Sequence, residues 1–414
     1  MNFFSYQDGT LCAENVPLVE IAKQYGTPAF VYSRAAIERG YREFSEACGG
    51  RDVLICYSVK ANSNLAVLNL LARLGSGFDI VSGGELARVL AAGGRADRIV
   101  FSGVGKSEAE LRAALGAGVL CFNVESEGEL DRLASLASAA GKTAAVSLRV
   151  NPDVDPRTHP YIATGLRESK FGIAYDAAMP LYRKAARLPG IRVTGIDVHI
   201  GSQITDIGPF VAALEKVLEF VDALEATGVR LDQLDLGGGL GIRYRDENPP
   251  ALKDYLGSLF GRLGERKLRI LFEPGRSLVG NTGLLLTRVE YLKHGATKNF
   301  AVVDAAMNDL IRPALYDAWH EVLPVIRREG PARRYDIVGP VCESADFLAK
   351  ERSLALAAGD LLAIMSAGAY GMAMSSNYNS RPRAAEIIVD GARQWLVRER
   401  ERVETLFASE RLLP

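Results

Sequence analysis

The sequence is poor in the residues that hold small secreted proteins and metal sites together. Its 414 residues include five cysteines and four histidines. The cysteines are scattered and form no C-x-x-C pair, which favours a reducing cytosol over a disulfide framework. The histidines lack the spacing typical of metal ligands, so no metal site is expected. These scarcities indicate a cytoplasmic protein without structural metal.

Strong charge and long apolar runs are also missing. The formal net charge is −1, which gives no electrostatic basis for binding nucleic acid or an anionic membrane surface. No apolar run approaches the length of a membrane-spanning helix. Residues 1–10 lack the basic and apolar regions of a secretory signal. We therefore expect a small-molecule partner rather than a nucleic acid or a membrane.

What is present is an ordinary globular composition, with 48% hydrophobic and 24% charged residues. The chain is long for one domain, so two domains are expected. From about residue 35, strand and helix patterns alternate, as in a parallel sheet. Eight such units favour a (β/α)8 TIM barrel, with an open doubly wound sheet as the alternative. The expected strands are 54–59, 78–81, 99–102, 119–123, 145–150, 193–200, 233–236 and 269–273, with helices between them such as 107–115, 126–139, 176–188 and 209–225.

The pattern changes after Arg276, where short strand patterns follow one another with few helices. This arrangement is typical of a mostly β domain, resembling a sandwich or barrel. The N-terminal 31 residues fit neither pattern clearly, and we expect them to pack with the β domain. The predicted domains are a barrel over 33–278 and a β domain over 1–32 and 279–414. The expected β-domain strands are 284–291, 300–304, 335–338, 361–365, 385–389 and 395–398.

Lys60 stands where the first barrel strand meets a loop and then a helix. The preceding residues 53–57 are apolar and β-prone, as in a buried strand. A lysine at the end of a buried strand is costly unless it is paired or used. Its position alone leaves open a salt-bridged or snorkelling lysine. The residues at the other strand ends decide whether Lys60 is a structural lysine or a reactive one.

Charged, polar and glycine residues that could bind a cofactor follow several of the expected strands. In a barrel of this type the carboxyl ends of the strands form the active-site face, and glycine-rich loops after strands seven and eight commonly bind phosphate. A lysine, a carboxylate and a phosphate site at one mouth match the needs of pyridoxal phosphate. The strand ends concerned carry Lys60, Asp79, His199-Ile-Gly-Ser202-Gln, Gly237-Gly238-Gly239-Leu-Gly and Glu273-Pro-Gly275-Arg276.

Two other glycine motifs are misleading. Residues 103–107, Gly-Val-Gly-Lys-Ser, resemble the end of a P-loop, but Val100 stands where that motif needs its first glycine. Residues 237–241 resemble a dinucleotide fingerprint, but Ile242 stands where its third glycine belongs. The second motif also follows the seventh strand rather than opening the first βα unit.

Seven motifs in order carry a family resemblance over about residues 28–381. The chain resembles the fold type III, alanine-racemase-like pyridoxal-phosphate decarboxylases. The resemblance implies a barrel followed by a β domain, in agreement with the strand pattern. The motifs are Tyr-Ser-Val-Lys60-Ala-Asn, His199-Ile-Gly-Ser-Gln, Gly-Gly-Gly239-Leu-Gly, Glu273-Pro-Gly-Arg276, Arg312-Pro-Ala-Leu-Tyr316, Gly-Pro-Val-Cys342-Glu343-Ser, and Ala-Gly-Ala-Tyr370-Gly with a following Ser-Ser-Asn377-Tyr-Asn.

The resemblance implies cofactor contacts for the barrel residues. Lys60 would hold pyridoxal 5′-phosphate covalently until the substrate amine displaces it. A lysine is a nucleophile only when neutral, and burial favours that state. Glu273 would face the ring nitrogen, and His199 would stack on the ring. Asp79 would support His199 or Lys60, unless it is a solvated loop acid. The remaining cofactor contacts implied are Ser202, Gly238, Gly239, Gly275, Arg276 and Tyr370.

The resemblance also implies substrate contacts. Arg276, Arg312 and Tyr316 would bind carboxylate, to which a guanidinium fits bidentately, and Tyr370 would reach cofactor or substrate. Cys342 would reprotonate the product from the neighbouring subunit of a homodimer, although a lone cysteine is more often a buried core thiol. Glu343 would recognise the far ammonium of meso-2,6-diaminopimelate.

The expected reaction is decarboxylation at the D-centre of meso-2,6-diaminopimelate, giving L-lysine and CO2 as the last step of lysine biosynthesis. Related decarboxylases of other basic amino acids usually have Asp after the cysteine, where this chain has Glu343. Ala345 departs from the glycine that many enzymes of the expected specificity carry. The alternatives are decarboxylation of ornithine, lysine, arginine or carboxynorspermidine, amino-acid racemisation, and a catalytically dead relative that binds the cofactor.

Overall fold

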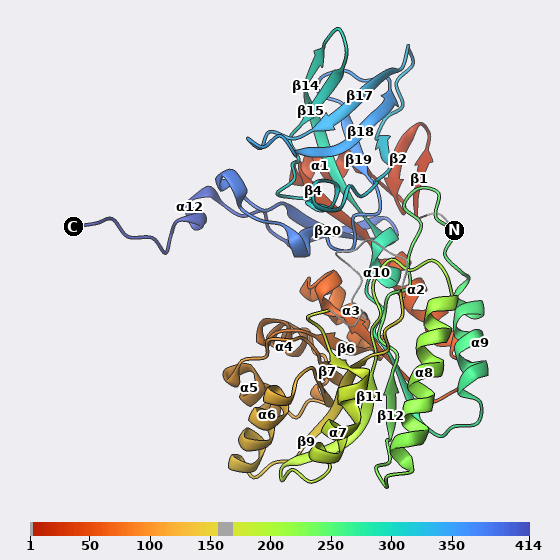
Figure 1. The fold of residues 1–414 in the computed structure, drawn as a ribbon. Coiled ribbons are helices and arrows are strands. Elements are labelled where there is room, and N and C mark those ends of the chain that lie inside the picture. Colours follow the sequence, from red (N-terminus) through yellow and green to blue (C-terminus); the bar gives the residue numbers. More distant parts are fainter. Residues whose placement is uncertain (1–2, 156–168) are drawn as a thin grey trace. The chain divides into compact units, whose positions relative to one another are not determined.

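The computed structural model describes residues 3–155 and 169–414 (Figure 1). The chain divides into two compact units. Unit 1 comprises Met1–Gly40, Arg243–Glu247 and Leu278–Pro414, and unit 2 comprises Tyr41–Ile242 and Asn248–Ser277. Among the helices of the described residues, none is both long and apolar enough to cross a bilayer.

Unit 2 is a closed, eight-stranded parallel barrel, so the TIM-barrel prediction is confirmed and the open-sheet alternative is wrong. Neighbouring strands pair in parallel around the ring. The ring closes where β13 pairs with β5 and where β8 pairs with β9. The barrel strands are β5 (Val53–Ser58), β6 (Gly77–Ile80), β7 (Ile99–Phe101), β8 (Cys121–Val124), β9 (Ala144–Asn151), β11 (Ile191–Asp197), β12 (Gln233–Asp235) and β13 (Arg269–Phe272), and β10 (Ile173–Ala174) extends β9.

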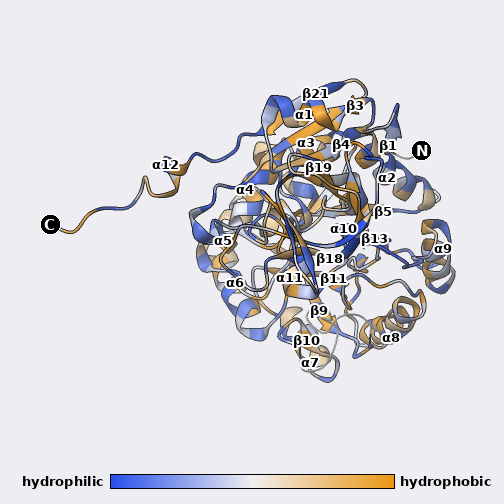
Figure 2. Cartoon of the chain, turned by 90° about the horizontal axis from the view of Figure 1, so that it is seen from above, coloured by the Kyte–Doolittle hydropathy of each residue, from blue (hydrophilic) through white to orange (hydrophobic). Residues whose placement is uncertain are grey.

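The helices of unit 2 surround these strands, and Figure 2 shows several of them as a ring seen from above. Several begin at a serine whose hydroxyl accepts a backbone N–H of the first turn, as N-caps do. Ser107 forms a full capping box with Glu110, which fixes the start of α5. The helices are α3 (Leu65–Arg73), α4 (Gly83–Ala91), α5 (Glu108–Ala117), α6 (Glu127–Ala139), α7 (Tyr175–Ala185), α8 (Gly208–Glu225) and α9 (Leu252–Leu263).

Unit 1 is built mainly from strands, as expected from the residues after Arg276. Its main sheet has the order β18-β17-β15-β14-β4-β20-β21, and β19 pairs with both β14 and β16. The strands are β4 (Ala29–Ser33), β14 (Gly283–His294), β15 (Asn299–Val303), β16 (Val322–Pro324), β17 (Arg333–Val338), β18 (Phe347–Leu354), β19 (Leu361–Ile364), β20 (Ala385–Asp390) and β21 (Arg393–Arg398). A separate three-stranded sheet contains β1 (Phe4–Gln7), β2 (Thr10–Ala13) and β3 (Val16–Pro17).

The N-terminal segment belongs to unit 1, which confirms that it packs with the β domain. Strand β4 lies between β14 and β20, antiparallel to one and parallel to the other. Its side chains Ala29 and Val31 join a buried apolar cluster with residues of β14 and β20. The helices of this unit are α1 (Leu18–Tyr25), α11 (Arg312–Tyr316) and α12 (Val403–Leu406), while α2 (Arg34–Ala47) and α10 (Arg276–Val279) run from one unit into the other.

Candidate active site

The predicted barrel residues lie at or just after the carboxyl ends of different strands of unit 2. Lys60 follows β5, Asp79 lies in β6, His199 follows β11, and Glu273 follows β13. In a closed parallel barrel these ends share one mouth. Backbone bonds join neighbouring loops there: Glu273 N–H donates to Gly237 O at 2.7 Å, and Ser58 N–H donates to Pro274 O at 3.1 Å.

Lys60 is paired with Asp79. The Lys60 Nζ lies 2.9 Å from Asp79 Oδ2, and the same oxygen accepts the Ser58 hydroxyl at 2.6 Å. Asp79 is fully buried, whereas 37% of the Lys60 side chain is exposed. Lys60 is thus only partly buried, and its amine faces a buried carboxylate. Asp79 acts on Lys60, so its alternative reading as a solvated loop acid is wrong.

His199 is held as a neutral imidazole. Its Nδ1 accepts the Gly238 N–H at 3.1 Å, so in the neutral ring the proton sits on Nε2. Burial lowers the pKa of His199 well below its usual value, and the cations of Arg149 and Lys60 lower it further. A neutral, oriented ring presents a flat apolar face, which suits stacking on another planar group.

The loop after β12 brings bare backbone close to its neighbours. Gly239 has a φ of +107°, and a Cβ there would lie 2.5 Å from Gly201 O. A Cβ at Gly238 would lie 2.2 Å from Glu273 O. Side chains are therefore excluded from both positions, and the loop can present its N–H groups to an anion.

A cluster of buried acids lies in the barrel. The nearest carboxylate oxygens of Asp197, Asp235 and Glu273 lie within 4.8 Å of one another. Burial raises the pKa of Glu273 and of Asp197 well above the usual range, and raises that of Asp235 to about 6. The neighbouring carboxylates raise the pKa of Glu273 further, because like charges disfavour ionisation. Burial and the neighbouring carboxylates therefore both favour the protonated form of Glu273.

Arg276 and Ser202 are brought together from two different loops. Arg276 is buried, and its Nη2 donates to Ser202 Oγ at 3.0 Å. Ser202 lies in the loop after β11, and Arg276 follows the turn after β13. The pair places a cation beside the Gly275 turn, where a Cβ would contact the Cβ atoms of Ser58 and Ala61 at 3.0 Å.

The predicted residues after Arg276 lie in unit 1. Arg312 is buried at the start of α11, and Tyr316 at its end is half-buried. Tyr370 has a φ of +56°, in the left-handed region that few tyrosines adopt. Such a backbone is costly and persists where the surroundings enforce it, which is common at functional sites.

Cys342 is exposed, whereas the other four cysteines are buried. The alternative reading of Cys342 as a buried core thiol is therefore wrong. Its N–H donates to Asn379 Oδ1 at 2.8 Å. Asp346 braces the same loop by accepting the N–H groups of Val341 at 2.8 Å and Met307 at 2.7 Å. Glu343 is exposed beside the thiol in sequence and accepts the Ser344 N–H at 2.9 Å.

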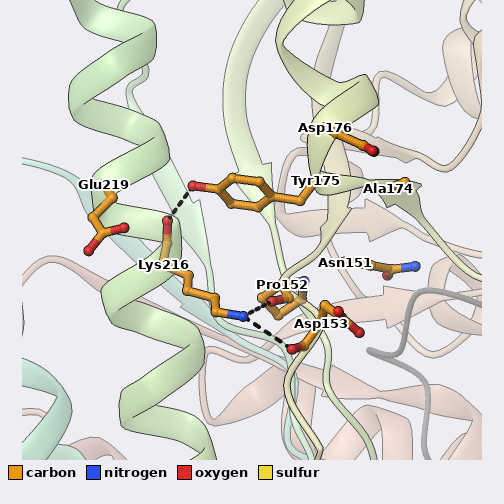
Figure 3. Close-up of a pocket in the computed structure, with 8 residues that line it drawn as sticks. All are labelled: Asn151, Pro152, Asp153, Ala174, Tyr175, Asp176, Lys216 and Glu219. Atoms are coloured by element: carbon orange, nitrogen blue, oxygen red, sulfur yellow. Dashed lines mark hydrogen bonds between the residues drawn. The ribbon is translucent and has the colours of Figure 1, made fainter.

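A separate pocket of about 330 Å³ lies between the ends of β9 and β10 and the helices α7 and α8 (Figure 3). Lys216 donates across it to the carbonyls of Pro152 at 2.8 Å and Asp153 at 3.1 Å, and its own carbonyl accepts the Tyr175 hydroxyl at 3.1 Å. None of the predicted site residues lines this pocket. The lysine ties a strand-end loop to α8.

Four polar residues of the site were not predicted. Asp197 and Asp235 stand inside apolar strands, two residues before His199 and Gly237 respectively. Asn123 Nδ2 lies 3.4 Å from Asp235 Oδ2, and Arg149 Nη1 donates to Glu125 at 3.3 Å. A charged side chain in a buried strand is costly. An acid two positions before a strand-end motif therefore indicates a candidate site residue from the sequence alone.

These residues fit pyridoxal phosphate. Within the described part of the chain, Asp79 Oδ1 and Asp197 Oδ1 are buried without a hydrogen-bond partner. The buried carboxyl of Glu273 offers a partner for a ring nitrogen, and the bare turn at Gly238 and Gly239 offers N–H groups for a phosphate. Lys60 supplies the amine that a bound aldehyde requires.

Comparison with known proteins agrees with this chemistry. The family model "Pyridoxal-dependent decarboxylase, pyridoxal binding domain" matches residues 34–280. The diaminopimelate decarboxylase of Pseudomonas aeruginosa is 60% identical, with both chains covered over their full length. That of Vibrio cholerae is 58% identical, again over 100% of each chain. The chain belongs to the pyridoxal-dependent decarboxylases and, within them, to the diaminopimelate decarboxylase family.

A solved structure with the same architecture is the diaminopimelate decarboxylase of M. jannaschii in co-complex with L-lysine. It has a TM-score of 0.94 and 36% identity, over 100% of this chain and 98% of that one. The Helicobacter pylori enzyme complexed with L-lysine has a TM-score of 0.92 and 42% identity, over 95% of this chain and 99% of that one.

Proposed function

We propose that this protein is a carboxy-lyase that uses pyridoxal 5′-phosphate to decarboxylate meso-2,6-diaminopimelate at its D-centre. The products are L-lysine and CO2, in the last step of lysine biosynthesis. The observation that carries the proposal is the set at the barrel mouth: the Lys60 amine on Asp79, the buried Glu273, and the bare turn at Gly238 and Gly239. The choice of substrate is supported by the 60% identity, over the full length, to a diaminopimelate decarboxylase.

The barrel residues take the cofactor roles. When bound, pyridoxal phosphate draws the electrons of the breaking bond into its ring. The Lys60 amine attaches the cofactor and yields to the substrate amine. Glu273 would face the ring nitrogen, and His199 would stack on the ring as a neutral imidazole, whose pKa burial lowers. Ser202, Gly238, Gly239 and Gly275 would hold the phosphate.

The substrate is recognised by its charged ends. Arg276, Arg312 and Tyr316 bind carboxylate, Glu343 binds the far ammonium, and Tyr370 contacts cofactor or substrate. A carboxylate bound tightly in the ground state would be slow to leave, because such binding does not favour the transition state. The arginines therefore serve the carboxylate that remains in L-lysine.

Cys342 delivers the proton that replaces CO2. Its thiol is exposed in the single chain, which supports a role toward a second copy. We assign residues 33–278 to cofactor binding, and 1–32 with 279–414 to substrate and dimer contacts. The active unit is then a homodimer whose sites are shared, working in the cytoplasm.

The test is to incubate the purified protein with pyridoxal phosphate and meso-2,6-diaminopimelate and to measure L-lysine and CO2. Ornithine, lysine, arginine and carboxynorspermidine are run in parallel, and preferred turnover of one of them would replace the proposed substrate. Inversion without CO2 release would identify a racemase instead. Lys60→Ala should abolish both turnover and the visible absorbance of the bound cofactor, and persistence of both would refute the role of Lys60.

Shared sites are tested by mixing inactive Lys60→Ala and Cys342→Ala variants. Subunit exchange places one intact Lys60 and one intact Cys342 in the same site, so partial activity should return. Exchange is followed with two differently labelled proteins. No recovery despite exchange would show that each chain completes its own site.

A further inference from the structure

The buried His320 has its tautomer fixed by two contacts within unit 1. Its Nδ1 lies 2.8 Å from Met365 O, and its Nε2 lies 2.8 Å from Arg312 Nη1. A carbonyl oxygen only accepts and a guanidinium only donates. Nδ1 therefore carries the hydrogen, and the lone pair of Nε2 accepts from Arg312. His320 is thus a hydrogen-bond acceptor for a buried cation.

The sheet holds His320 firmly in place. Strand β16 begins two residues later and pairs antiparallel with β19, and Met365 N–H donates to Glu321 O at 2.8 Å. The His320 carbonyl accepts Arg352 Nη2 at 3.0 Å. The residues that directly follow His320 are therefore fixed by backbone pairing, which holds the acceptor position in place.

Arg312 is held from a second side by Tyr244. Its guanidinium carbon lies 4.4 Å from the centre of the Tyr244 ring, and that ring meets the His320 ring edge-on at 5.3 Å. A ring face attracts the cation and sets the plane of the guanidinium. The hydrogen bond to His320 Nε2 then fixes the rotation of the Arg312 guanidinium within that plane. Bidentate binding of a carboxylate needs both to be set.

We propose that His320 is a positioning residue that orients the Arg312 guanidinium toward the substrate carboxylate that remains in L-lysine. The proposal rests on the proposed function, because that function makes Arg312 a carboxylate-binding group. His320 touches neither substrate nor cofactor in this role. Its loss changes the binding of one chemical group and leaves the cofactor as it is.

The test compares two ligands of the holoenzyme, L-lysine and 1,5-diaminopentane, which differ by that carboxylate alone. Their dissociation constants are obtained from changes in cofactor absorbance. In His320→Asn the amide can still donate to Met365 O but is too short to reach Arg312. We expect L-lysine to bind about tenfold more weakly, as for loss of one hydrogen bond to a charged group. Binding of 1,5-diaminopentane should stay unchanged, as should the absorbance of the cofactor.

His320→Gln is the rescue variant, since its amide oxygen reaches the place of Nε2. It should keep L-lysine affinity within about threefold of wild type, a small part of the energy of one such bond. Should His320→Asn fail to fold, His320→Gln carries the test, because a tenfold loss in it would overturn the proposal. His294→Asn is the matched control: this exposed histidine of the same unit bonds Tyr335 Oη at 2.9 Å, and neither ligand should be affected.

The steady-state kinetics give a second readout. His320→Asn should raise KM for meso-2,6-diaminopimelate about tenfold with little change in kcat, as for a group that binds ground and transition states alike. Equal weakening of both ligands, or a changed cofactor spectrum, would overturn the proposal. A wild-type enzyme that binds L-lysine but does not decarboxylate diaminopimelate would overturn the proposed function instead, and the ligand comparison would still decide on His320.

Discussion

Asp79 Oδ2 accepts two hydrogen bonds, from Lys60 Nζ at 2.9 Å and from Ser58 Oγ at 2.6 Å. The two donors come from the end of β5 and the turn after it, and the acceptor from β6. One buried oxygen thus sets where the amine can lie, because Asp79 is fixed inside the sheet. The pairing makes Asp79 the support of the residue on which the chemistry depends.

Replacing Asp79 by Asn should slow the enzyme without removing the cofactor. The amide keeps the shape but loses the charge-assisted bond, worth about 1.5–3 kcal/mol, so kcat should fall about ten- to a hundredfold. Turnover and the absorbance of the bound cofactor are measured together. The matched control is Asp97→Asn, whose exposed pair with Arg95 should contribute nothing measurable. Unchanged kcat in Asp79→Asn would show that the pair is incidental.

Replacing Glu273 by Gln should impair catalysis more severely. The amide cannot give a proton to a ring nitrogen, so the stabilisation of developing charge is lost. A buried group of this kind contributes about 2.7–4 kcal/mol, which corresponds to a fall in kcat of about 10²–10³. Single-turnover measurements separate this step from substrate binding. A loss confined to KM would place Glu273 outside the electron-accepting part of the site.

Replacing Gly239 by Ala should weaken cofactor binding by at least about tenfold. The φ of +107° strains any L side chain, and the new Cβ would lie 2.5 Å from Gly201 O. The loop must shift, and its N–H groups then leave the anion. Affinity for pyridoxal phosphate is measured by titrating the cofactor-free protein. Gly257→Ala in α9 is the control, because nothing lies within 4 Å of its Cβ position; equal losses in both variants would contradict the role of the turn.

Replacing Asp235 by Asn should stabilise the protein, and more so as pH rises. Burial raises the pKa of Asp235 to about 6 from a usual 3.8. The folded state therefore holds a proton that the unfolded state has released, so this carboxyl costs stability as pH rises through that window. The full cost above pH 6 is about 3 kcal/mol, from 1.36 kcal/mol per unit of pKa.

Melting temperatures of wild type and Asp235→Asn between pH 4 and pH 8 check this sign. The two should be close near pH 4, and the variant should melt higher at pH 8. Asp232→Asn is the control, since Asp232 is exposed and pairs with Arg192 at the surface. A gap that does not change with pH would show that Asp235 is not the group that titrates.

The barrel could be predicted because its signal is repeated. Each buried parallel strand is an apolar run, and each is followed by a helix pattern, so all eight were placed within a few residues. Strand β18 was missed because Lys350, Glu351 and Arg352 interrupt its apolar pattern. The two-residue β10 and the three-residue β16 are too short to show a period. Their positions depend on partners distant in sequence.

The candidate site could be predicted where a reactive, charged or glycine residue directly follows an apolar strand. Lys60, Glu273 and the glycines of 237–239 are predicted in this way, and the structure places each of them just after a barrel strand. Asp197 and Asp235 were missed because a single acid in an apolar run looks like a strand with an exposed face. Their pKa values are raised mainly by burial inside the barrel, and that burial depends on the closed ring of strands, which no local pattern contains. The roles of Cys342 and Glu343 stay predictions.

The pairing of β13 with β5 places Ile270 opposite Val53. The first and last barrel strands thus pair although more than two hundred residues separate them, and such long-range pairings make folding slow. Lys60 and Glu273 lie just beyond that seam, on its two sides. The absorbance of the bound cofactor should therefore appear late during refolding, after most of the helical circular dichroism. Its appearance would report the closure of the barrel between β13 and β5.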